Sequence, residues 1–294
     1  MRSYKIVEGE CSLQGSESWL QFRRDRIGAS DAAAVLGVSP WMTRLQLFSS
    51  KIEGTSTPSN PAMQRGTRLE PKARDFVNQI MKSNYQPALI QSLKYPGLIA
   101  SLDGYWEKED GTIHILEIKV PGIASHTLAL EGTIPENYIP QLDHQLLVSG
   151  LDSVIYFSFD GENGTFLKHS RDEKRISELL AVELKFLSDL NEFRPPEPSD
   201  MDWVEKYDLN SLALSHRYKV ISQMISDLED EKEELKEQMI EGLNHPKVKI
   251  GKVCIQKTMR KGNYDVEKII EKYLVLDAED FRKPSSESWR ITFE

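Results

Sequence analysis

Apolar residues recur at helical spacing in the first third of the chain. A predicted helix runs to about Met81, and Pro71 is expected to start or kink it; its apolar face consists of Leu69, Ala73, Phe76, Val77 and Ile80. A shorter helix is predicted over 30–37, where Ser30 is a good N-cap and Gly37 a good C-terminal stop. Residues 1 to about 60 are therefore expected to be mostly helical after an irregular start.

Strand patterns follow between residues 98 and 170. Two strands are predicted over 98–106, broken at Asp103-Gly104, and over 112–120, joined by a turn at Glu109-Asp110-Gly111. A helix over 140–148 is expected to stop at Gly150, and an amphipathic helix is expected from Asp172 to Leu190. A hairpin is predicted from two further strands, over 154–159 and 165–170. This mixture predicts an α/β (α+β) fold.

A stiff segment, Arg194-Pro195-Pro196-Glu197-Pro198, interrupts this pattern and cannot continue a helix. It suggests one domain over 1–194 and an extension of unknown role over 199–294. A helix is predicted over about 204–243, strongly charged from Asp227 to Glu237, then a strand pair over 247–259 broken at Gly251. With a last strand over 288–293, the extension is expected to be a helical arm with a small β element.

Composition narrows the class of protein. No run of 18 apolar residues exists, so we expect no membrane span, and the N-terminus lacks the apolar core of a signal peptide. The two cysteines, Cys11 and Cys254, are too few for a disulfide framework or an iron–sulfur cluster and favour a reducing cytoplasm. The net charge of −9 argues against a broadly basic nucleic-acid coat but leaves room for a local channel.

The segment Ile113–Val120 contains the clearest candidates for catalytic and metal-binding residues. Side chains alternate along a strand, so Glu117 and Lys119 share one face and the apolar residues around them take the other. Cross-strand neighbours lie about 5 Å apart, so Asp103 on the preceding strand can reach the same ion as Glu117. Two carboxylates with water suit Mg²⁺, which can activate water for phosphodiester hydrolysis while the lysine positions it. By itself this motif is also typical of an ordinary surface hairpin with an exposed ion pair.

Four blocks of sequence occur in a fixed order. They are Trp19–Arg23 with Ile27–Asp31, then Gly66–Pro71, then Leu102–Gly104 with Leu116–Lys119, and finally Tyr138–Gln141. They cover about residues 15–195 and are far more specific together than alone. Together they resemble the YqaJ-like viral recombinase and lambda exonuclease family of PD-(D/E)xK nucleases. The resemblance implies a restriction-endonuclease-like core with a central mixed β-sheet flanked by helices.

The resemblance also implies roles for the metal site. Asp103 and Glu117 would bind Mg²⁺, for which Mn²⁺ can substitute, with the backbone carbonyl of Ile118 as a further ligand. Lys119 would orient the attacking water. Glu70 would be an additional acidic residue, offered from a helix.

A pocket for a terminal 5′-phosphate is implied as well. Arg23, Ser30 and Gln141 would line it, and Tyr138 lies about one helical turn before Gln141. A helix N-terminus and an arginine are both suited to a phosphate. Taken singly, these residues are equally typical of a solvated helix face, a plain N-cap or half-buried polar groups.

The activity implied is 5′ to 3′ digestion of linear double-stranded DNA, leaving 3′ single strands for recombination by an annealing protein. Such a phage or prophage protein would work in the cytoplasm of a bacterial host, and relatives often form a ring-shaped trimer around DNA. The alternatives are an endonuclease or defence nuclease on the same fold, and an inactive module that binds DNA ends. The charged arm could serve assembly, a partner or DNA, or be a plain solvated helix.

Several other residues are interpreted as structural. Trp19 is expected to support packing, and Trp41 is expected in the core or an interface rather than against DNA. His114 is expected to be structural, while His126 and His144 lack metal-ligand spacing.

Overall fold

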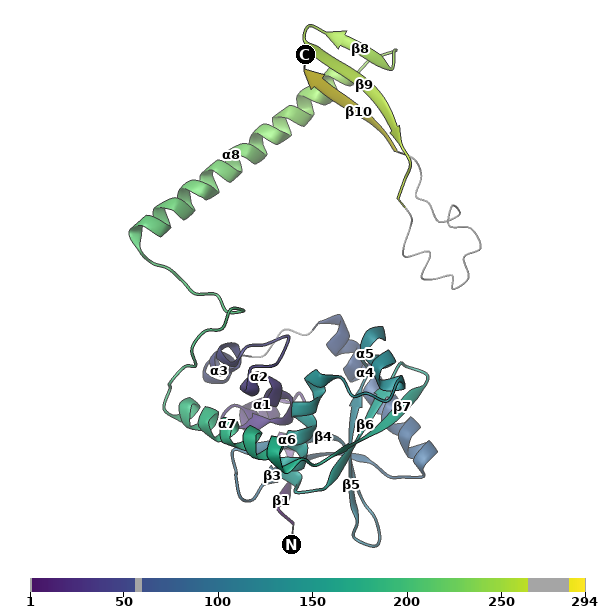
Figure 1. Ribbon diagram of the computed structural model, residues 1–294, viewed down its shortest axis with the longest axis vertical. Helices are drawn as coiled ribbons and strands as arrows, with labels where there is room; N and C mark the ends of the chain where they lie inside the picture. Colours follow the sequence, from purple (N-terminus) through teal and green to yellow (C-terminus); the bar gives the residue numbers. More distant parts are fainter. Residues whose placement is uncertain (1, 56–59, 264–285, 294) are drawn as a thin grey trace. The chain divides into compact units, whose positions relative to one another are not determined.

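Seven strands form one mixed sheet in the first 204 residues (Figure 1). The computed structural model describes residues 2–55, 60–263 and 286–293 and divides into two compact units, 1–204 and 205–294. The division falls shortly after the proline-rich segment at 194–198. The predicted extension over 199–294 is described except for 264–285 and 294.

The sheet of the first unit combines antiparallel and parallel pairs. Its order is β1 (Tyr4–Val7), β3 (Gln86–Ser92), β4 (Leu98–Glu107), β5 (Ile113–Lys119), β6 (Ser153–Phe159) and β7 (Gly164–Ser170), with β2 (Ile27–Gly28) paired to β4. The pairs β5–β6 and β2–β4 are parallel and the others antiparallel. A parallel pair needs a crossover. The crossover between β5 and β6 carries α5 (Ile123–Leu130), η3 (Glu136–Tyr138) and α6 (Ile139–Ser149).

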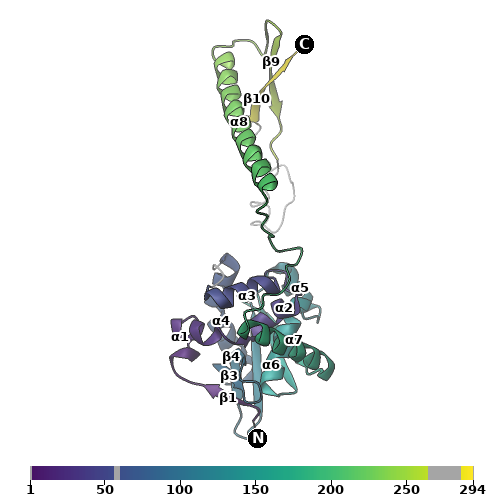
Figure 2. The same ribbon diagram turned by 90° about the vertical axis from the view of Figure 1, so that its left-hand side faces the viewer.

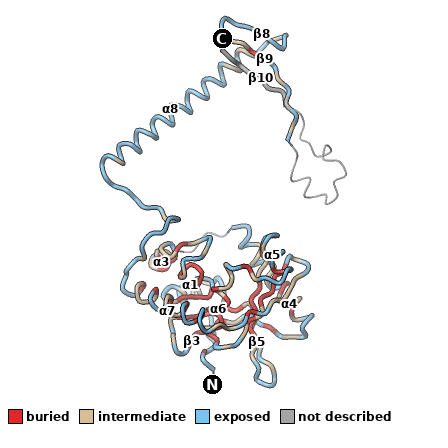
Figure 3. The backbone as a smooth tube through the Cα atoms, in the orientation of Figure 1, coloured by how far each residue is buried: buried red, intermediate tan, exposed pale blue. Residues whose placement is uncertain are grey.

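Helices cover both faces of this sheet (Figure 2). The larger core lies on the face covered by α6, together with α2 (Ala32–Leu36), α3 (Arg44–Glu53) and α7 (Glu173–Asn191). The smaller core lies under α4 (Pro61–Met81) and is rich in aromatic side chains such as Phe157 and Phe159. The central strands β4, β5 and β6 and the helix α6 are accordingly largely buried (Figure 3). The predicted central mixed sheet flanked by helices is confirmed.

Alternation along β5 determines which side chains face α6. Ile115 belongs to the larger core, whereas Leu116 and Ile118 belong to the smaller one, so Glu117 and Lys119 are directed to the α6 side. The break predicted at Asp103-Gly104 is instead an irregularity within a continuous strand. Between Leu102 and Tyr105, β4 contains one residue more than the facing part of β3, as in a β-bulge.

The first half of the chain differs from the prediction in several elements. α4 begins at Pro61, where Asn60 caps it by accepting from Met63 N at 2.9 Å, and Pro71 lies inside the helix. Ser30 is not an N-cap, because it belongs to the 3-10 turn η2 (Ala29–Asp31) that precedes α2. The strands β1 and β3 and the helix α5 were not predicted. Two further elements, η1 (Glu10–Ser12) and α1 (Glu17–Arg23), occupy the irregular start.

The second unit contains one long helix and a small sheet. Its helix α8 (Leu209–Ile240) is capped by Asp208, which accepts from Ser211 N at 2.9 Å. The antiparallel strands β8 (Lys247–Ile250), β9 (Val253–Arg260) and β10 (Ser286–Phe293) follow in the order β10-β9-β8. The helical arm with a small β element is thus present. No helix among the described residues of the chain is long and apolar enough to cross a membrane.

A buried ion pair joins α6 to α7 beneath the sheet. His144 Nδ1 lies 2.6 Å from Glu183 Oε1, and His144 Nε2 lies 2.9 Å from the carbonyl oxygen of Ile99. Both side chains are 0% exposed. Burial alone would lower the pKa of His144, but the Glu183 carboxylate and the Ile99 carbonyl raise it. Both ring nitrogens of His144 are thus engaged by acceptors, which favours its protonated form.

We expect Glu183→Gln to lower the free energy of unfolding by about 3 kcal/mol, because it leaves a buried charge without its partner. Since the folded-state pKa of His144 is raised, the contribution of the pair is complete below the unfolded pKa of histidine and is lost as the pH rises through the folded pKa. Urea denaturation at several pH values measures this difference. The exposed Glu178 on the same helix provides the control Glu178→Gln, and an equal effect of the two changes would contradict the assignment.

Candidate active site

Glu117 is a buried carboxylate whose two oxygens are held by three donors. Its residue exposure is 1%, and Lys119 Nζ lies 2.5 Å from Oε1. Gln141 Nε2 donates to Oε1 at 2.6 Å and Gln145 Nε2 to Oε2 at 2.5 Å. The glutamines lie one turn apart on α6, so the crossover helix places both amides over the strand that carries the carboxylate.

Asp103 lies next to this group at the irregular part of β4. Its Oδ2 accepts from the backbone N–H of Ile118 at 2.8 Å, one residue from Glu117. Arg74 on α4 donates from Nε to the backbone oxygen of Asp103 at 2.6 Å. The irregularity and these two bonds direct Asp103 toward β5, so the convergence expected from the strand alternation is present.

Glu70 completes the group from α4. It forms an ion pair with Arg74 one turn further along the helix. The pKa of Glu70 is raised by burial and by Glu117, although Arg74 opposes the rise. The interaction with Glu117 places Glu70 at the edge of the same cluster, while its carboxylate is engaged by Arg74.

The cluster holds more negative charge than its one ammonium balances. Burial, Glu117 and Glu70 raise the pKa of Asp103 well above its usual value. Burial alone would lower the pKa of Lys119, but Glu117 and Asp103 outweigh it and raise that pKa, so Lys119 stays protonated. Carboxylate oxygens in excess of cations fit a hard divalent ion such as Mg²⁺. Among the described residues, no three His, Cys, Asp or Glu side chains form a closed metal site, so water and substrate oxygens would have to complete the coordination.

A second polar group surrounds Arg23 at the end of α1. The guanidinium donates to Ser30 Oγ at 2.9 Å and to Asp31 Oδ1 at 3.0 Å, and it lies 4.5 Å from the ring centre of Trp19. A Cβ at Gly28 would lie 2.8 Å from Arg23 Nη2, so only glycine permits this approach. Trp19 therefore supports the arginine, as expected for a packing residue.

Asp31 balances two cations in this second group. Besides Arg23, it pairs with Lys51 Nζ at 2.9 Å. Burial alone would raise the pKa of Asp31, but Lys51 and Arg23 outweigh it and lower that pKa. The side chain of Arg23 is 18% exposed, whereas that of Lys51 is 7% exposed. The group thus has an excess positive charge, and Arg23 is its more accessible cation.

The structure distributes the four predicted phosphate-pocket residues over both groups. Arg23 and Ser30 are together, whereas Gln141 is hydrogen-bonded to Glu117. The ring centre of Tyr138 lies 5.3 Å from Lys119 Nζ, and Tyr138 precedes α6 rather than lying within it. The two groups are neighbours through α6, which packs against both η2 and β4.

One residue of the site was missed from the sequence. Gln145 was not singled out, although its position one turn after Gln141 in a predicted helix could have indicated it. Trp41 was expected in the core or an interface; it is not in the core, because it is 69% exposed and stacks on Tyr138 with ring centres 6.5 Å apart. It follows Pro40 in a loop, and its position beside Tyr138 depends on the tertiary fold.

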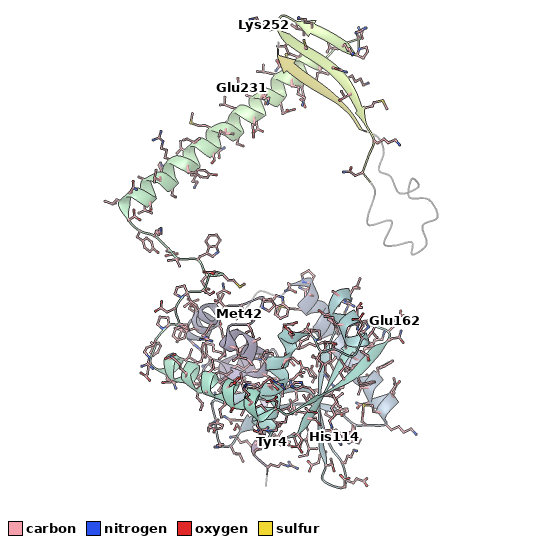
Figure 4. The ribbon with its side chains drawn as sticks, viewed as in Figure 1. Tyr4, Met42, His114, Glu162, Glu231 and Lys252 are labelled. Atoms are coloured by element: carbon pink, nitrogen blue, oxygen red, sulfur yellow. The ribbon has the colours of Figure 1, made fainter. Side chains whose placement is uncertain are left out.

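His126 contacts β6 on the same face of the sheet as Lys119. Its Nδ1 lies 2.8 Å from Ser158 Oγ, and Ser158 is the register partner of Lys119 on β6. His114 packs against Trp106, with ring centres 5.6 Å apart, on the hairpin of β4 and β5 (Figure 4). Both contacts are consistent with structural roles.

The first unit is similar to known proteins in sequence and in fold. Residues 18–152 match the YqaJ-like viral recombinase domain. The chain is similar to the uncharacterised protein YqaJ of Bacillus subtilis, with 28% identity over 185 residues, which are 60% of this chain and 57% of that protein. The chain thus spans little more than half the length of that curated relative.

Two solved structures of the alkaline exonuclease LHK-Exo from Laribacter hongkongensis are also similar. The complex of that enzyme with dAMP has 27% identity and a TM-score of 0.53, covering 61% of this chain and 94% of that one. The second structure has 26% identity and a TM-score of 0.51 over the same shares. The fold of the first unit is therefore similar to that of an alkaline exonuclease, and residues 18–152 match the model of the YqaJ-like viral recombinase domain.

We expect Asp103→Asn to raise the free energy of unfolding at neutral pH in the absence of divalent ions. A carboxyl with a raised folded-state pKa costs stability as the pH rises from its unfolded pKa toward the folded one. The increase in the free energy of unfolding that Asp103→Asn produces is therefore absent near pH 3 and grows toward neutral pH. Urea denaturation in chelating buffer measures it, and a loss of stability at pH 7 would contradict the charge excess.

Proposed function

We propose that the protein is a Mg²⁺-dependent deoxyribonuclease that digests the 5′-ended strand of linear double-stranded DNA. The observation that supports this most strongly is the partly buried cluster of Asp103, Glu117 and Lys119, in which carboxylates outnumber cations. The similarity to an alkaline exonuclease is consistent with it. Digestion from 5′ ends would leave 3′ single strands for an annealing protein.

Asp103 and Glu117 would hold the metal, together with the carbonyl of Ile118, and Glu70 would be available if Arg74 releases it. A bound Mg²⁺ would supply neutralisation of phosphate charge and activation of water. Mn²⁺ has the same preference for oxygen ligands and could substitute. Gln141 and Gln145 would orient the Glu117 carboxylate toward the ion, a common task of groups that hydrogen-bond to metal ligands.

Lys119 would act on the substrate side of the cluster. Its raised pKa keeps the ammonium charged, so it would hold the attacking water and stabilise charge on the scissile phosphate rather than act as a base in the resting state. The ring of Tyr138 lies against the ammonium and limits where it can move.

Arg23 and Ser30 would bind the terminal 5′-phosphate. The guanidinium presents paired donors, and phosphate would take over part of the interaction that Asp31 now makes. That the similar exonuclease was solved with dAMP, a nucleoside monophosphate, is consistent with a phosphate site in this fold. The exposed Trp41, supported by Tyr138, offers a surface on which a nucleobase can stack.

Digestion of end-labelled linear duplex, with and without 5′-phosphate, in Mg²⁺ tests this function directly. Faster release of label from the phosphorylated 5′ end is the expected result, and covalently closed plasmid should remain intact. Cleavage of the closed plasmid as fast as linear DNA would indicate an endonuclease or defence nuclease on the same fold. Binding to ends without any cleavage would indicate an inactive end-binding module.

We expect Lys119→Ala to reduce the cleavage rate by about 10²-fold or more, because it removes a preorganised positive charge from the transition state. The exposed Lys168 on β7 provides the control Lys168→Ala. Single-turnover cleavage measures both, with circular dichroism to verify folding. Equal rates for Lys119→Ala and wild type would refute the catalytic role.

We expect Arg23→Gln to abolish most of the preference for a 5′-phosphorylated end. Removing one charge-assisted phosphate contact costs about 2 kcal/mol, or about 30-fold in affinity for the phosphorylated substrate. The same duplex without 5′-phosphate is the matched control, on which the variant and the wild type should differ little. An equal loss on both substrates would assign Arg23 to the fold instead.

A further inference from the structure

Helix α8 carries an apolar stripe with the spacing of a coiled coil. Along this stripe, residues separated alternately by four and three positions are apolar, with one exception. This spacing is the heptad pattern by which one helix packs against another. The seam consists of Leu214, Tyr218, Ile221, Ile225, Leu228, Lys232, Leu235 and Met239.

Among the described residues of the second unit, none buries this seam, and only Met239 at its end is partly covered. α8 contains no buried residue, and Tyr218 and Leu228 are 76% and 61% exposed. Figure 3 shows the helix exposed over most of its length. Long exposed apolar stripes mark surfaces that another molecule covers, and most helical stability in proteins comes from such packing.

The charges on α8 indicate how a partner helix would run. The half over 209–226 contains Arg217 and Lys219 and no acidic residue, whereas the half over 227–240 contains seven acidic residues and two lysines. Acidic residues favour the N-terminal end of a helix dipole, so this distribution does not stabilise an isolated α8. A second α8 running in the opposite direction would place each acidic half beside a basic half. A parallel pair would place the two acidic halves together.

We propose that α8 forms an antiparallel two-stranded coiled coil with α8 of a second copy of this chain. In the register that aligns the heptads, Ile221 packs against the partner's Ile225 and Tyr218 against the partner's Leu228. Arg217, which flanks the seam, then meets the partner's Glu231. Each contact occurs twice about a twofold axis.

Lys232, the one seam residue that is not apolar, is compatible with this register. Lys232 lies opposite the partner's Leu214, and its aliphatic stem can cover that side chain while the ammonium reaches solvent. A single polar residue in an apolar seam disfavours alignments of the two helices in which it would be buried. It also lowers the stability of the coiled coil. Glu231 projects from the surface of α8, where a partner can reach it (Figure 4).

Two adjacent substitutions in the full-length chain test the seam. Ile221 lies on the seam and Val220 beside it, and both are 45% exposed. Ile221→Asp should weaken self-association on the order of 100-fold, because it buries an unpaired charge, whereas Val220→Asp should leave it unchanged. Analytical ultracentrifugation measures the doubling of mass that pairing through α8 produces. Association through the first unit would not remove this doubling, because neither substitution lies in that unit. Equal effects of the two substitutions, or no such step in the wild type, would overturn the proposal.

Exchange of charges tests the direction of the pair. Arg217→Glu and Glu231→Arg should each weaken association by about 10-fold, and the double variant should restore it. Within one helix these residues are about 21 Å apart, so restoration can arise only between copies. In a parallel coil Glu231 would instead meet the partner's Lys236, and the double variant would stay weak. That outcome would overturn the antiparallel arrangement.

Discussion

The structure of the first unit depends on one buried carboxylate. Glu117 is almost inaccessible, and a charge so placed costs several kcal/mol unless donors surround it. Its donors come from its own strand, through Lys119, and from α6, through Gln141 and Gln145. The crossover that makes β5 and β6 parallel neighbours therefore also supplies donors that offset the cost of burying the Glu117 charge. Fold and site share one set of contacts.

The neighbouring carboxylates are less well compensated. Asp103 receives one backbone N–H, while Glu117 and Glu70 raise its pKa, so the cluster is costly without a cation. A centre that stabilised all three carboxylates internally would have little affinity left for an ion. Glu117 is well compensated by its three donors, whereas Asp103 is not. Such a local conflict is typical of functional sites, which retain it at the expense of stability.

Much of this was predictable because periodicity is local. β4, β5, the β6–β7 hairpin, α7 and the arm follow from alternation or helical spacing, and alternation alone brought Glu117, Lys119 and Asp103 together. The elements that were missed depend on distant partners: β1 exists by pairing with β3, and Ser30 bonds to Arg23 instead of capping. Gln141 was placed with Arg23, but its actual partner is set by how the crossover lays α6 on β5. A linear pattern does not contain that geometry.

Unbalanced charge is what the two units have in common. In the first, carboxylates are gathered where one ammonium cannot neutralise them. In the second, acidic and basic residues are separated along α8 against the direction favoured by its dipole. Neither arrangement is explained by the stability of a single copy of the chain. Both would become favourable with the proposed partners, a divalent ion in one case and an oppositely directed helix in the other. The stability lost in the isolated molecule is therefore available as binding energy at these two places.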